Sequence, residues 1–346
     1  MLYQTQNPHG GDIYGTEVLL DFSANTNPFG TPKGVLDAIC GALPDIHRYP
    51  DPYCRRLVQA IAEFEDVPKK YILCGNGAAD LIYAYCEAVR PGLAVELAPT
   101  FSEYALGLKR VDCDILRYQL NPEMCFELDA FFLDFLDKTK PEVVFLCNPN
   151  NPTGKTIAPV LLEKILVFCK HHNIRLFVDE CFLDLSDSGE SLKPMLAQFP
   201  NLFILKAFTK SYGMAGIRLG YCMCSDSELL EQMSQSAQPW NVSSVAQAAG
   251  VAALQEHAFL EKTKELIVTE RQWLKEKLED CGFQVYPSSA NYLLFLADSN
   301  LHTKLKKKKI AIRNCDNYIG LGPGWYRIAV RLHEENEMLI RAIKEV

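Results

Sequence analysis

One lysine and one arginine stand close together in a run of small residues near the middle of the chain. Lys210 and Arg218 belong to residues 207–220, whose sequence is AFTKSYGMAGIRLG. A lysine amine forms Schiff bases with carbonyl compounds when it can lose its proton. An arginine guanidinium binds phosphate through a planar, permanently charged fork. The pair therefore predicts a site that holds a phosphorylated aldehyde covalently at one end and ionically at the other.

Two further motifs precede this lysine. Asp179 follows the apolar run 174–178, where a carboxylate can pair with a protonated ring nitrogen. Asn151 lies in the turn NPNNPTG of residues 148–154, whose prolines restrict the backbone and can aim an amide at a ring substituent. Alone, Asp179 is better explained as a helix cap or a surface ion pair, and Asn151 as part of an ordinary turn. Their order before Lys210 favours a site.

An anion site and an aromatic face are predicted earlier in the chain. Gly75, Asn76, Gly77 and Ala78 come after an apolar strand and before an apolar helical stretch, a context in which backbone amides bind phosphate. Phe101 follows the next strand and offers a ring for stacking. Together, these features indicate that the phosphorylated aldehyde is pyridoxal 5′-phosphate (PLP).

The five motifs, in this order, resemble those of the fold-type I PLP-dependent enzymes, the superfamily of aspartate aminotransferase, over nearly the whole chain. The resemblance implies that Lys210 is the Schiff-base lysine, that Asp179 pairs with the pyridinium nitrogen, and that Phe101 stacks on the ring. It further implies that Asn151 contacts the phenolic oxygen. The cofactor phosphate would be bound by Gly75, Asn76, Gly77, Ala78 and Arg218. The family usually has a further hydroxyl donor at the position of Ala207, and Thr209 would replace that donor here.

The same resemblance predicts a homodimer. Tyr49, in the segment Arg48-Tyr49-Pro50-Asp51, matches a tyrosine that reaches the cofactor phosphate of the partner subunit. The active sites would then be built across the subunit interface.

The substrate-binding residues point to a subfamily. His9 opens an H-G-G motif, and Arg313 and Arg327 lie on neighbouring strands, where two guanidiniums suit a phosphate better than a single carboxylate. These stretches resemble the threonine-phosphate decarboxylases of cobalamin biosynthesis. This resemblance implies that the substrate is a small phosphorylated amino acid, bound by His9, Arg313, Arg327 and Asn151. Phe182 stands where aminotransferases often carry a tyrosine.

Three alternatives stay open. The histidinol-phosphate aminotransferases share most of the cofactor motifs and would transfer an amine to 2-oxoglutarate instead. Serine phosphate differs from threonine phosphate by one methyl group, which a pocket discriminates by only about 1–3 kcal/mol. A PLP-binding regulator without catalytic activity would need a DNA-binding module, and no basic helix-turn-helix extension is present.

Composition excludes several other classes. The 346 residues have a net charge of −8, which argues against nucleic-acid binding. We find no apolar stretch of membrane-spanning length and no apolar leader segment, and thirteen scattered cysteines show no metal-binding spacing. We therefore expect reduced thiols, a cytoplasmic location and no metal. The basic run 304–309 is best explained by a solvated helix face.

Alternation of short apolar strands with amphipathic helices predicts an α/β fold. We expect a mostly parallel sheet with helices on both faces, as in fold-type I enzymes, followed by a smaller α+β domain. The predicted divisions are an N-terminal arm (1–45), a large PLP-binding domain (46–245) and a small C-terminal domain (246–346). The pattern of 243–280 predicts a long helix joining the two domains, and residues 310–313 predict one strand of the small domain.

Overall fold

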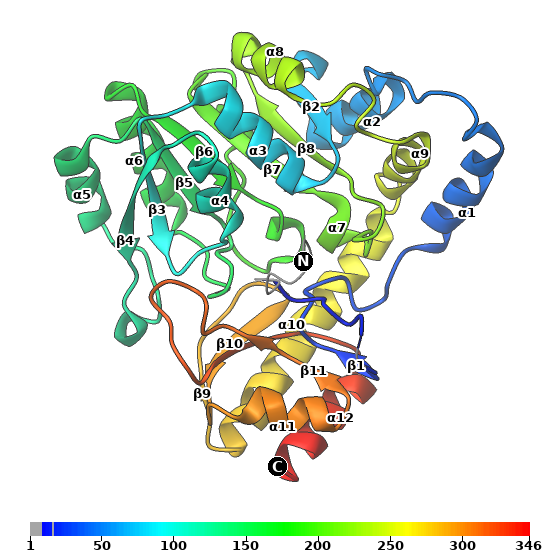
Figure 1. Ribbon diagram of the computed structural model, residues 1–346, viewed down its shortest axis with the longest axis vertical. Coiled ribbons are helices and arrows are strands. Elements are labelled where there is room, and N and C mark those ends of the chain that lie inside the picture. The colour runs from blue at the N-terminus through cyan, green and yellow to red at the C-terminus, as the bar shows by residue number, and fades with distance from the viewer. Residues whose placement is uncertain (1–8, 16) are drawn as a thin grey trace.

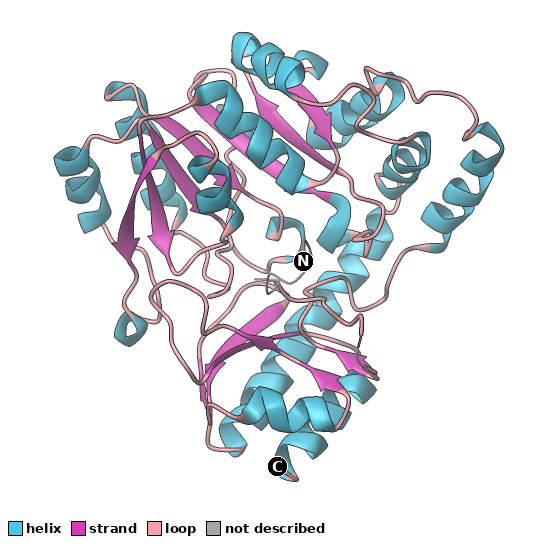
Figure 2. Ribbon diagram, viewed as in Figure 1, coloured by secondary structure: helices cyan, strands magenta, loops and turns pink. Residues whose placement is uncertain are grey.

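The computed structural model describes residues 9–15 and 17–346. Its core is a seven-stranded sheet in the order β2-β8-β7-β6-β5-β3-β4 (Figures 1 and 2). The strands from β7 through β4 run parallel, whereas β8 is antiparallel to both β7 and β2. The bounds are β2 (Ile72–Gly75), β3 (Leu93–Ala98), β4 (Asp114–Gln119), β5 (Val143–Cys147), β6 (Arg175–Asp179), β7 (Leu202–Ala207) and β8 (Gly220–Cys224).

Both faces of this sheet are covered. Along β5, Val144 and Leu146 enter one hydrophobic core while Val143, Phe145 and Cys147 enter another. This alternation follows from the two-residue period of a strand. Helices α3 (Ala78–Val89), α4 (Glu103–Lys109) and α8 (Ser227–Ser236) supply the second core, and α2 (Arg55–Glu65), α5 (Phe131–Thr139), α6 (Pro159–His171) and α9 (Ser244–Ala253) supply the first. The predicted α/β fold, with a mostly parallel sheet between helices, is confirmed.

A smaller antiparallel sheet, in the order β12-β13-β10-β9, lies at the end of the molecule that holds the C-terminus (Figure 1). Its strands are β9 (Gln284–Val285), β10 (Tyr292–Leu296), β12 (Arg313–Asn314) and β13 (Trp325–Ala329). Helices α10 (His257–Asp280), α11 (Leu301–Lys307) and α12 (His333–Lys344) pack around it, and α10 extends toward the large sheet. The predicted α+β region is therefore present.

The N-terminal part of the chain joins both regions. Strand β1 (Leu20–Asp21) pairs in parallel with β11 (Ile310–Ala311), beside the small sheet. Helix α1 (Lys33–Ala42), which was not predicted from the sequence, packs near α9 on the large-sheet side.

Two predicted elements need correction. The long helix over 243–280 is in fact α9 and α10, separated at Glu256, whose φ of −89° and ψ of 49° are not helical. The break lets α9 pack beside α1 while α10 takes its own direction toward the small sheet. The single strand over 310–313 is divided, because β11 pairs with β1 whereas β12 pairs with β13.

Candidate active site

The large sheet opens into a cavity where its parallel strands end at their carboxyl edge. The cavity has a volume of about 210 Å³. In open α/β sheets, ligands bind outside the carboxyl ends of the strands, and the loops after β3, β5, β6 and β7 all reach this space. Its lining residues are His9, Gly10, Ser23, Ala24, Asn25, Ala78, Ala79, Phe101, Cys147, Asn151, Asp179, Cys181, Phe182, Ala207, Thr209, Lys210, Arg218, Tyr318 and Arg327.

Asp179 is the last residue of β6 and lies at the floor of the cavity. Its Oδ2 accepts a 2.6 Å hydrogen bond from the Tyr104 hydroxyl, and its Oδ1 accepts a 2.9 Å bond from the Cys181 amide. Burial raises the pKa of Asp179, while the hydrogen bonds from Cys181 and Tyr104 and the charge of Lys210 act in the opposite direction. A buried carboxylate in this setting is best stabilised by a cationic partner.

Lys210 projects into the same cavity from α7 (Phe208–Ser211), directly after β7. Burial lowers the pKa of its amine to about 8, and the nearby positive charges of Arg327 and Arg218 contribute to this decrease. At pH 7 about a tenth of the amine is therefore neutral and nucleophilic, and the neutral fraction rises to about half at pH 8. Its Nζ lies 5.6 Å from the centre of the Phe182 ring.

The backbone of α7 is held from the N-terminal side. The amide of Asn27 donates to the Lys210 carbonyl at 3.0 Å, and Asn27 Nδ2 donates to the Ser211 carbonyl at 2.8 Å. Asn27 is buried, so these bonds are protected from water. The helix that carries the reactive lysine is thereby fixed by a residue more than 180 positions away.

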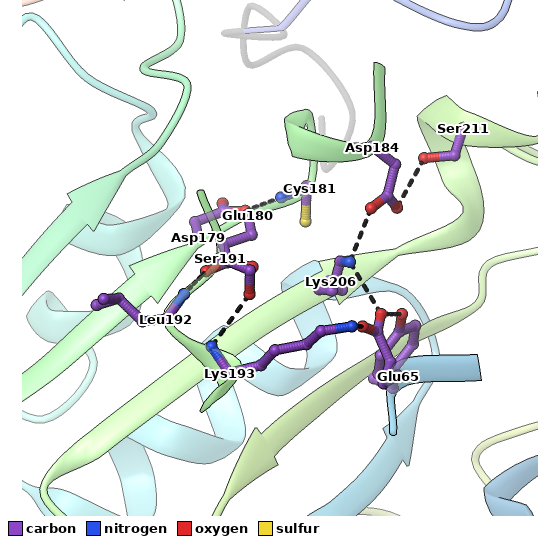
Figure 3. A network of polar contacts seen from close by, with 11 residues as sticks. Glu65, Asp179, Glu180, Cys181, Asp184, Ser191, Leu192, Lys193, Lys206 and Ser211 are labelled. Carbon is purple, nitrogen blue, oxygen red and sulfur yellow. Dashed lines mark hydrogen bonds and ion pairs between the residues drawn. The ribbon is translucent and has the colours of Figure 1, made fainter. Parts of the chain in front are cut away.

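A buried ionic network lies beside α7 (Figure 3). Lys206 Nζ contacts Asp184 Oδ1 at 2.7 Å and Glu65 Oε1 at 2.8 Å. Lys193 also binds Glu65, at 2.8 Å, and Ser211 Oγ donates to Asp184 Oδ2 at 3.3 Å. The network joins α2, β7, the segment after β6 and the last residue of α7. It therefore links the lysine-bearing helix to the core beneath the sheet.

The ionic state of this network follows from its contacts. Although burial opposes ionisation, the positive charge of Lys206 and several hydrogen bonds together lower the pKa of Glu65 to about 2. Glu180 is buried nearby and accepts hydrogen bonds from Ser191 and Leu192, but burial raises its pKa to about 7. Below pH 7, where Glu180 is mostly protonated, Lys193 and Lys206 balance the carboxylates of Glu65 and Asp184.

A cradle for an anion lies at the start of α3. Gly77 has a φ of 84° and precedes Ala78, the first helical residue. A Cβ atom on Gly77 would lie only 2.6 Å from a guanidinium nitrogen of Arg218, so only glycine permits this close approach. Ala78, Thr209 and Arg218 line the cavity at this end, whereas Gly75, Asn76 and Gly77 do not. Backbone amides at a helix start, together with a guanidinium, suit a phosphate.

Asn151 joins the loop after β5 to the small sheet. Its Oδ1 accepts hydrogen bonds from the Arg327 guanidinium and, at 3.2 Å, from the Tyr318 hydroxyl. This arrangement leaves Nδ2 as the donor for a ligand oxygen. Arg327, which is 5% exposed, also donates to the Ser23 carbonyl at 3.0 Å. Arg327 therefore positions two cavity-lining segments as well as placing a positive charge beside the cavity.

Of the other predicted site residues, His9 lines this cavity, whereas Arg313 and Tyr49 do not. The Nε2 atom of His9 contacts Glu103 Oε1 at 2.6 Å. Arg313 pairs in register with Arg327 but is not among the lining residues, and its guanidinium donates to Asn317 Oδ1 at 2.7 Å. Tyr49 is 80% exposed and stacks on Trp240 at 4.7 Å, outside the cavity. A single chain therefore does not bring Tyr49 to the site.

Several residues in or next to the cavity were not predicted to have a role in the site. Tyr104 reaches Asp179 from α4, and Tyr318 reaches Asn151 from the loop before β13. Neither belongs to a local motif. Ser23 and Asn25 lie in the stretch LDFSANTNP, residues 20–28, which carried part of the family resemblance and could have indicated their proximity to the site.

The residues around the cavity fit PLP as a group. The glycine cradle with Arg218 suits its phosphate, Asp179 suits a protonated ring nitrogen, Phe101 offers a ring face, and Lys210 can form a Schiff base with its aldehyde. Among residues 9–15 and 17–346, no cluster of His, Cys, Asp or Glu could hold a metal ion. In the same part of the chain, no helix is long and apolar enough to cross a membrane.

Comparison with known proteins defines the class. Residues 17–343 match the aminotransferase class I and II family, and the chain belongs to this family of PLP-dependent enzymes. The predicted cofactor is thereby confirmed. The chain is 36% identical to the threonine-phosphate decarboxylase of Salmonella typhimurium, over 98% of this chain and 96% of that protein.

Aminotransferases are also among the similar proteins. The histidinol-phosphate aminotransferase of Caldanaerobacter subterraneus subsp. tengcongensis is 31% identical, over 93% of this chain and 92% of that protein. The crystal structure of the histidinol-phosphate aminotransferase from Clostridium acetobutylicum superposes with a TM-score of 0.88 and 28% identity, covering 94% of this chain and 98% of that one. The predicted fold and superfamily are confirmed, and both candidate reactions occur among the relatives.

Proposed function

We propose that this protein decarboxylates L-threonine O-3-phosphate to (R)-1-aminopropan-2-yl phosphate, the reaction that supplies this building block for cobalamin. The observation that carries the proposal is the position of Arg327 beside Lys210, with His9 in the same cavity. These residues give the substrate side of the site positive charge and hydrogen-bond donors suited to a phosphomonoester. The 36% identity to a threonine-phosphate decarboxylase supports this choice.

Bound PLP would supply an electron sink for the charge that remains at the substrate Cα when carbon dioxide leaves. Asp179 would keep the ring nitrogen protonated, since its carboxylate is held by Tyr104 and Cys181. The amine of Lys210, whose pKa is about 8, can release and accept a proton near neutral pH. It is therefore our candidate for the acid that protonates Cα.

The choice of bond depends on which substrate group is anchored. The bond that stands perpendicular to the cofactor ring breaks fastest, so a decarboxylase must grip something other than the carboxylate. A phosphate held near His9, Arg313 and Arg327 would leave the carboxylate to take that orientation. Phe182, whose ring lies 5.0 Å from that of Tyr292, places an apolar group near Lys210.

Histidinol-phosphate aminotransferase is the second candidate, supported by the 31% identity to such an enzyme. It would use the same cofactor residues but would hold the substrate for cleavage of the Cα–H bond. Serine O-phosphate is a second possible substrate for the proposed decarboxylase and would give ethanolamine phosphate. Loss of the methyl contact changes affinity by only about 1–3 kcal/mol.

The deciding experiment measures two products from PLP-loaded protein. Carbon dioxide release is followed with L-threonine phosphate and L-serine phosphate, and amine transfer is followed from histidinol phosphate to 2-oxoglutarate. Lys210→Ala is the matched inactive control. Carbon dioxide release without transfer supports the decarboxylase and ranks the two substrates, whereas transfer without carbon dioxide release establishes the alternative.

We further propose a homodimer in which Tyr49 approaches the cofactor phosphate of the partner subunit. The exposure of Tyr49 and its absence from the cavity lining within one chain are consistent with this role. Light scattering should give twice the chain mass, and Tyr49→Phe should weaken PLP binding without changing the mass. A catalytically active monomer would exclude a contribution across the interface.

A further inference from the structure

A second cavity, of about 180 Å³, adjoins the active-site cavity on the side of the small sheet. His9, Gly10 and Ser23 line both spaces, so the two share a wall or an opening. We call this second cavity the vestibule. Its other lining residues come from the N-terminal segment, from α11 and from the strands β11 and β12, and are Asp12, Val18, His302, Lys306, Lys309, Ile310, Ala311, Ile312, Arg313 and Asn314.

Positive charge dominates the vestibule. Among the described residues, Lys306, Lys309 and Arg313 line it together with a single acidic side chain, that of Asp12. Glu17 offsets part of this charge, because it forms a 2.7 Å ion pair with Lys309. The remaining balance is still positive, although the whole chain carries a net charge of −8. A concave surface of this sign attracts anions and repels cations.

The helix α11 directs its lysines to different neighbours. Leu301 and Leu305 are buried beneath it. Lys304 binds Asp298 at 3.1 Å, and Lys308 binds Glu345, so acidic groups neutralise this side of the helix. His302 and Lys306, one helical turn apart, both line the vestibule. Among the described residues, Lys306 has no ion-pair partner, which leaves its charge available to a ligand.

A chain of positive groups therefore leads inward. Lys306 stands at the exposed side, Arg313 is buried in the vestibule wall, and Arg327 lies opposite Arg313 in the register of β12 and β13 and lines the active-site cavity. The sequence alone indicated only a solvated helix face for residues 304–309. The structure agrees that Lys306 and Lys309 are exposed and adds that both line the vestibule next to the active-site cavity.

We propose that the vestibule is an approach site for phosphomonoesters, in which Lys306 draws the phosphate dianion toward Arg313 and Arg327. This inference rests on the proposed function only in so far as the substrate carries a phosphate. L-threonine phosphate and histidinol phosphate share that group, so both should be guided. A ligand without the phosphate should not be guided by the vestibule.

The test measures the association rate constant of PLP-loaded protein with L-threonine phosphate by stopped-flow absorbance of the cofactor, at several salt concentrations. Because steering by a few charges changes association rates by roughly tenfold or more, loss of one charge in Lys306→Gln should slow association by about two- to threefold. The difference should disappear at high salt. Lys307→Gln is the matched control, since Lys307 is exposed on the same helix, forms no ion pair in the described part of the chain and does not line the vestibule.

Control ligands and variants separate the possible outcomes of this experiment. L-threonine, which lacks the phosphate, should associate equally with both variants. Equal slowing by Lys306→Gln and Lys307→Gln would mean that only net charge matters and would overturn the proposal, as would unchanged association in Lys306→Gln. If wild-type protein releases no carbon dioxide, the proposed decarboxylase fails, but the same comparison with histidinol phosphate still tests the vestibule.

Discussion

The hydroxyl of Tyr104 donates a 2.6 Å hydrogen bond to the carboxylate of Asp179, and both residues are buried. Tyr104 comes from α4, on the second-core side of the sheet, and Asp179 ends β6. Burial and the negative charge of Asp179 raise the pKa of Tyr104 well above its usual value, so the tyrosine remains a donor throughout the working pH range. The bond fixes the carboxylate toward which the cofactor nitrogen would be directed.

We expect Tyr104→Phe to lower kcat/KM by about ten- to hundredfold, because a hydrogen bond to a charged group contributes about 1.5–3 kcal/mol. Steady-state kinetics measures the change, with whichever substrate the carbon dioxide and amine-transfer assays identify. Tyr85→Phe is the matched control, since Tyr85 is buried in the same core and its hydroxyl has no hydrogen-bond partner in the described part of the chain. Equal activity losses in the two variants would show that the bond to Asp179 has no special role.

Ala207 allows a gain-of-function prediction. It lines the cavity with Thr209 and Arg218, at the position where the family resemblance predicts a hydroxyl residue. We expect Ala207→Ser to tighten PLP binding by about tenfold, since a hydroxyl there can donate to a charged phosphate oxygen. Equilibrium dialysis of the cofactor measures the affinity. Ala207→Val adds volume without a donor and should weaken binding, so tighter binding by both variants would refute the hydrogen-bond explanation.

The pKa of Lys210 predicts a pH dependence. Its folded-state value of about 8 lies below the ordinary 10.5, so between these values the unfolded chain binds more protons than the folded chain. Stability of the cofactor-free protein due to Lys210 should therefore rise as the pH rises through this window. The rate of PLP binding should increase with pH, with a midpoint near pH 8. The absorbance of the cofactor measures this rate.

Arg327→Gln should move that midpoint upward, because Arg327 is the largest charge contribution to the lowered pKa of Lys210. The cofactor-free Lys210→Ala protein should show no such pH-dependent phase. An identical midpoint in wild type and Arg327→Gln would exclude electrostatic control of the lysine by Arg327.

The buried network beside α7 predicts a stability effect. Lys206→Met would leave the carboxylate of Asp184 without its lysine partner and that of Glu65 with Lys193 alone. Removal of one member of a buried ion pair costs about 3–5 kcal/mol of unfolding free energy. Denaturant unfolding measures this. Lys33→Met, which breaks the exposed pair with Asp37, should cost less than about 1 kcal/mol. A similar small loss in Lys206→Met would mean that solvent reaches the network.

The residues that sequence motifs placed in the cavity share a physical property. Asn151, Asp179 and Lys210 each end or directly follow a buried strand, and parallel strands bring their carboxyl ends to one edge. Strand periodicity and local turns therefore sufficed to expect these residues together. The alternation of strands and helices along the chain was predicted in the same way, whereas the order of the strands in the sheet and the antiparallel β8 were not.

Other features depend on contacts between distant segments and carry no local signal. Tyr104 lies 75 positions from Asp179, and Tyr318 lies 167 positions from Asn151. The division of residues 310–313 between two strands depends on the distant partner β1, and the break at Glu256 depends on how α9 and α10 pack. Tertiary contacts decide each of these cases, so periodicity alone could not predict them.

The pairing of β1 with β11 determines when the site can be completed during synthesis. Phe22, next to β1, accepts a 2.8 Å hydrogen bond from the amide of Ala329, and Asn27 holds α7. A chain emerging from the ribosome exposes its first thirty residues long before residue 329 exists. The segment that completes the lysine site must therefore wait for the last strand. A truncated nascent chain could assemble the large sheet and yet lack a finished active site, which would limit premature capture of the cofactor.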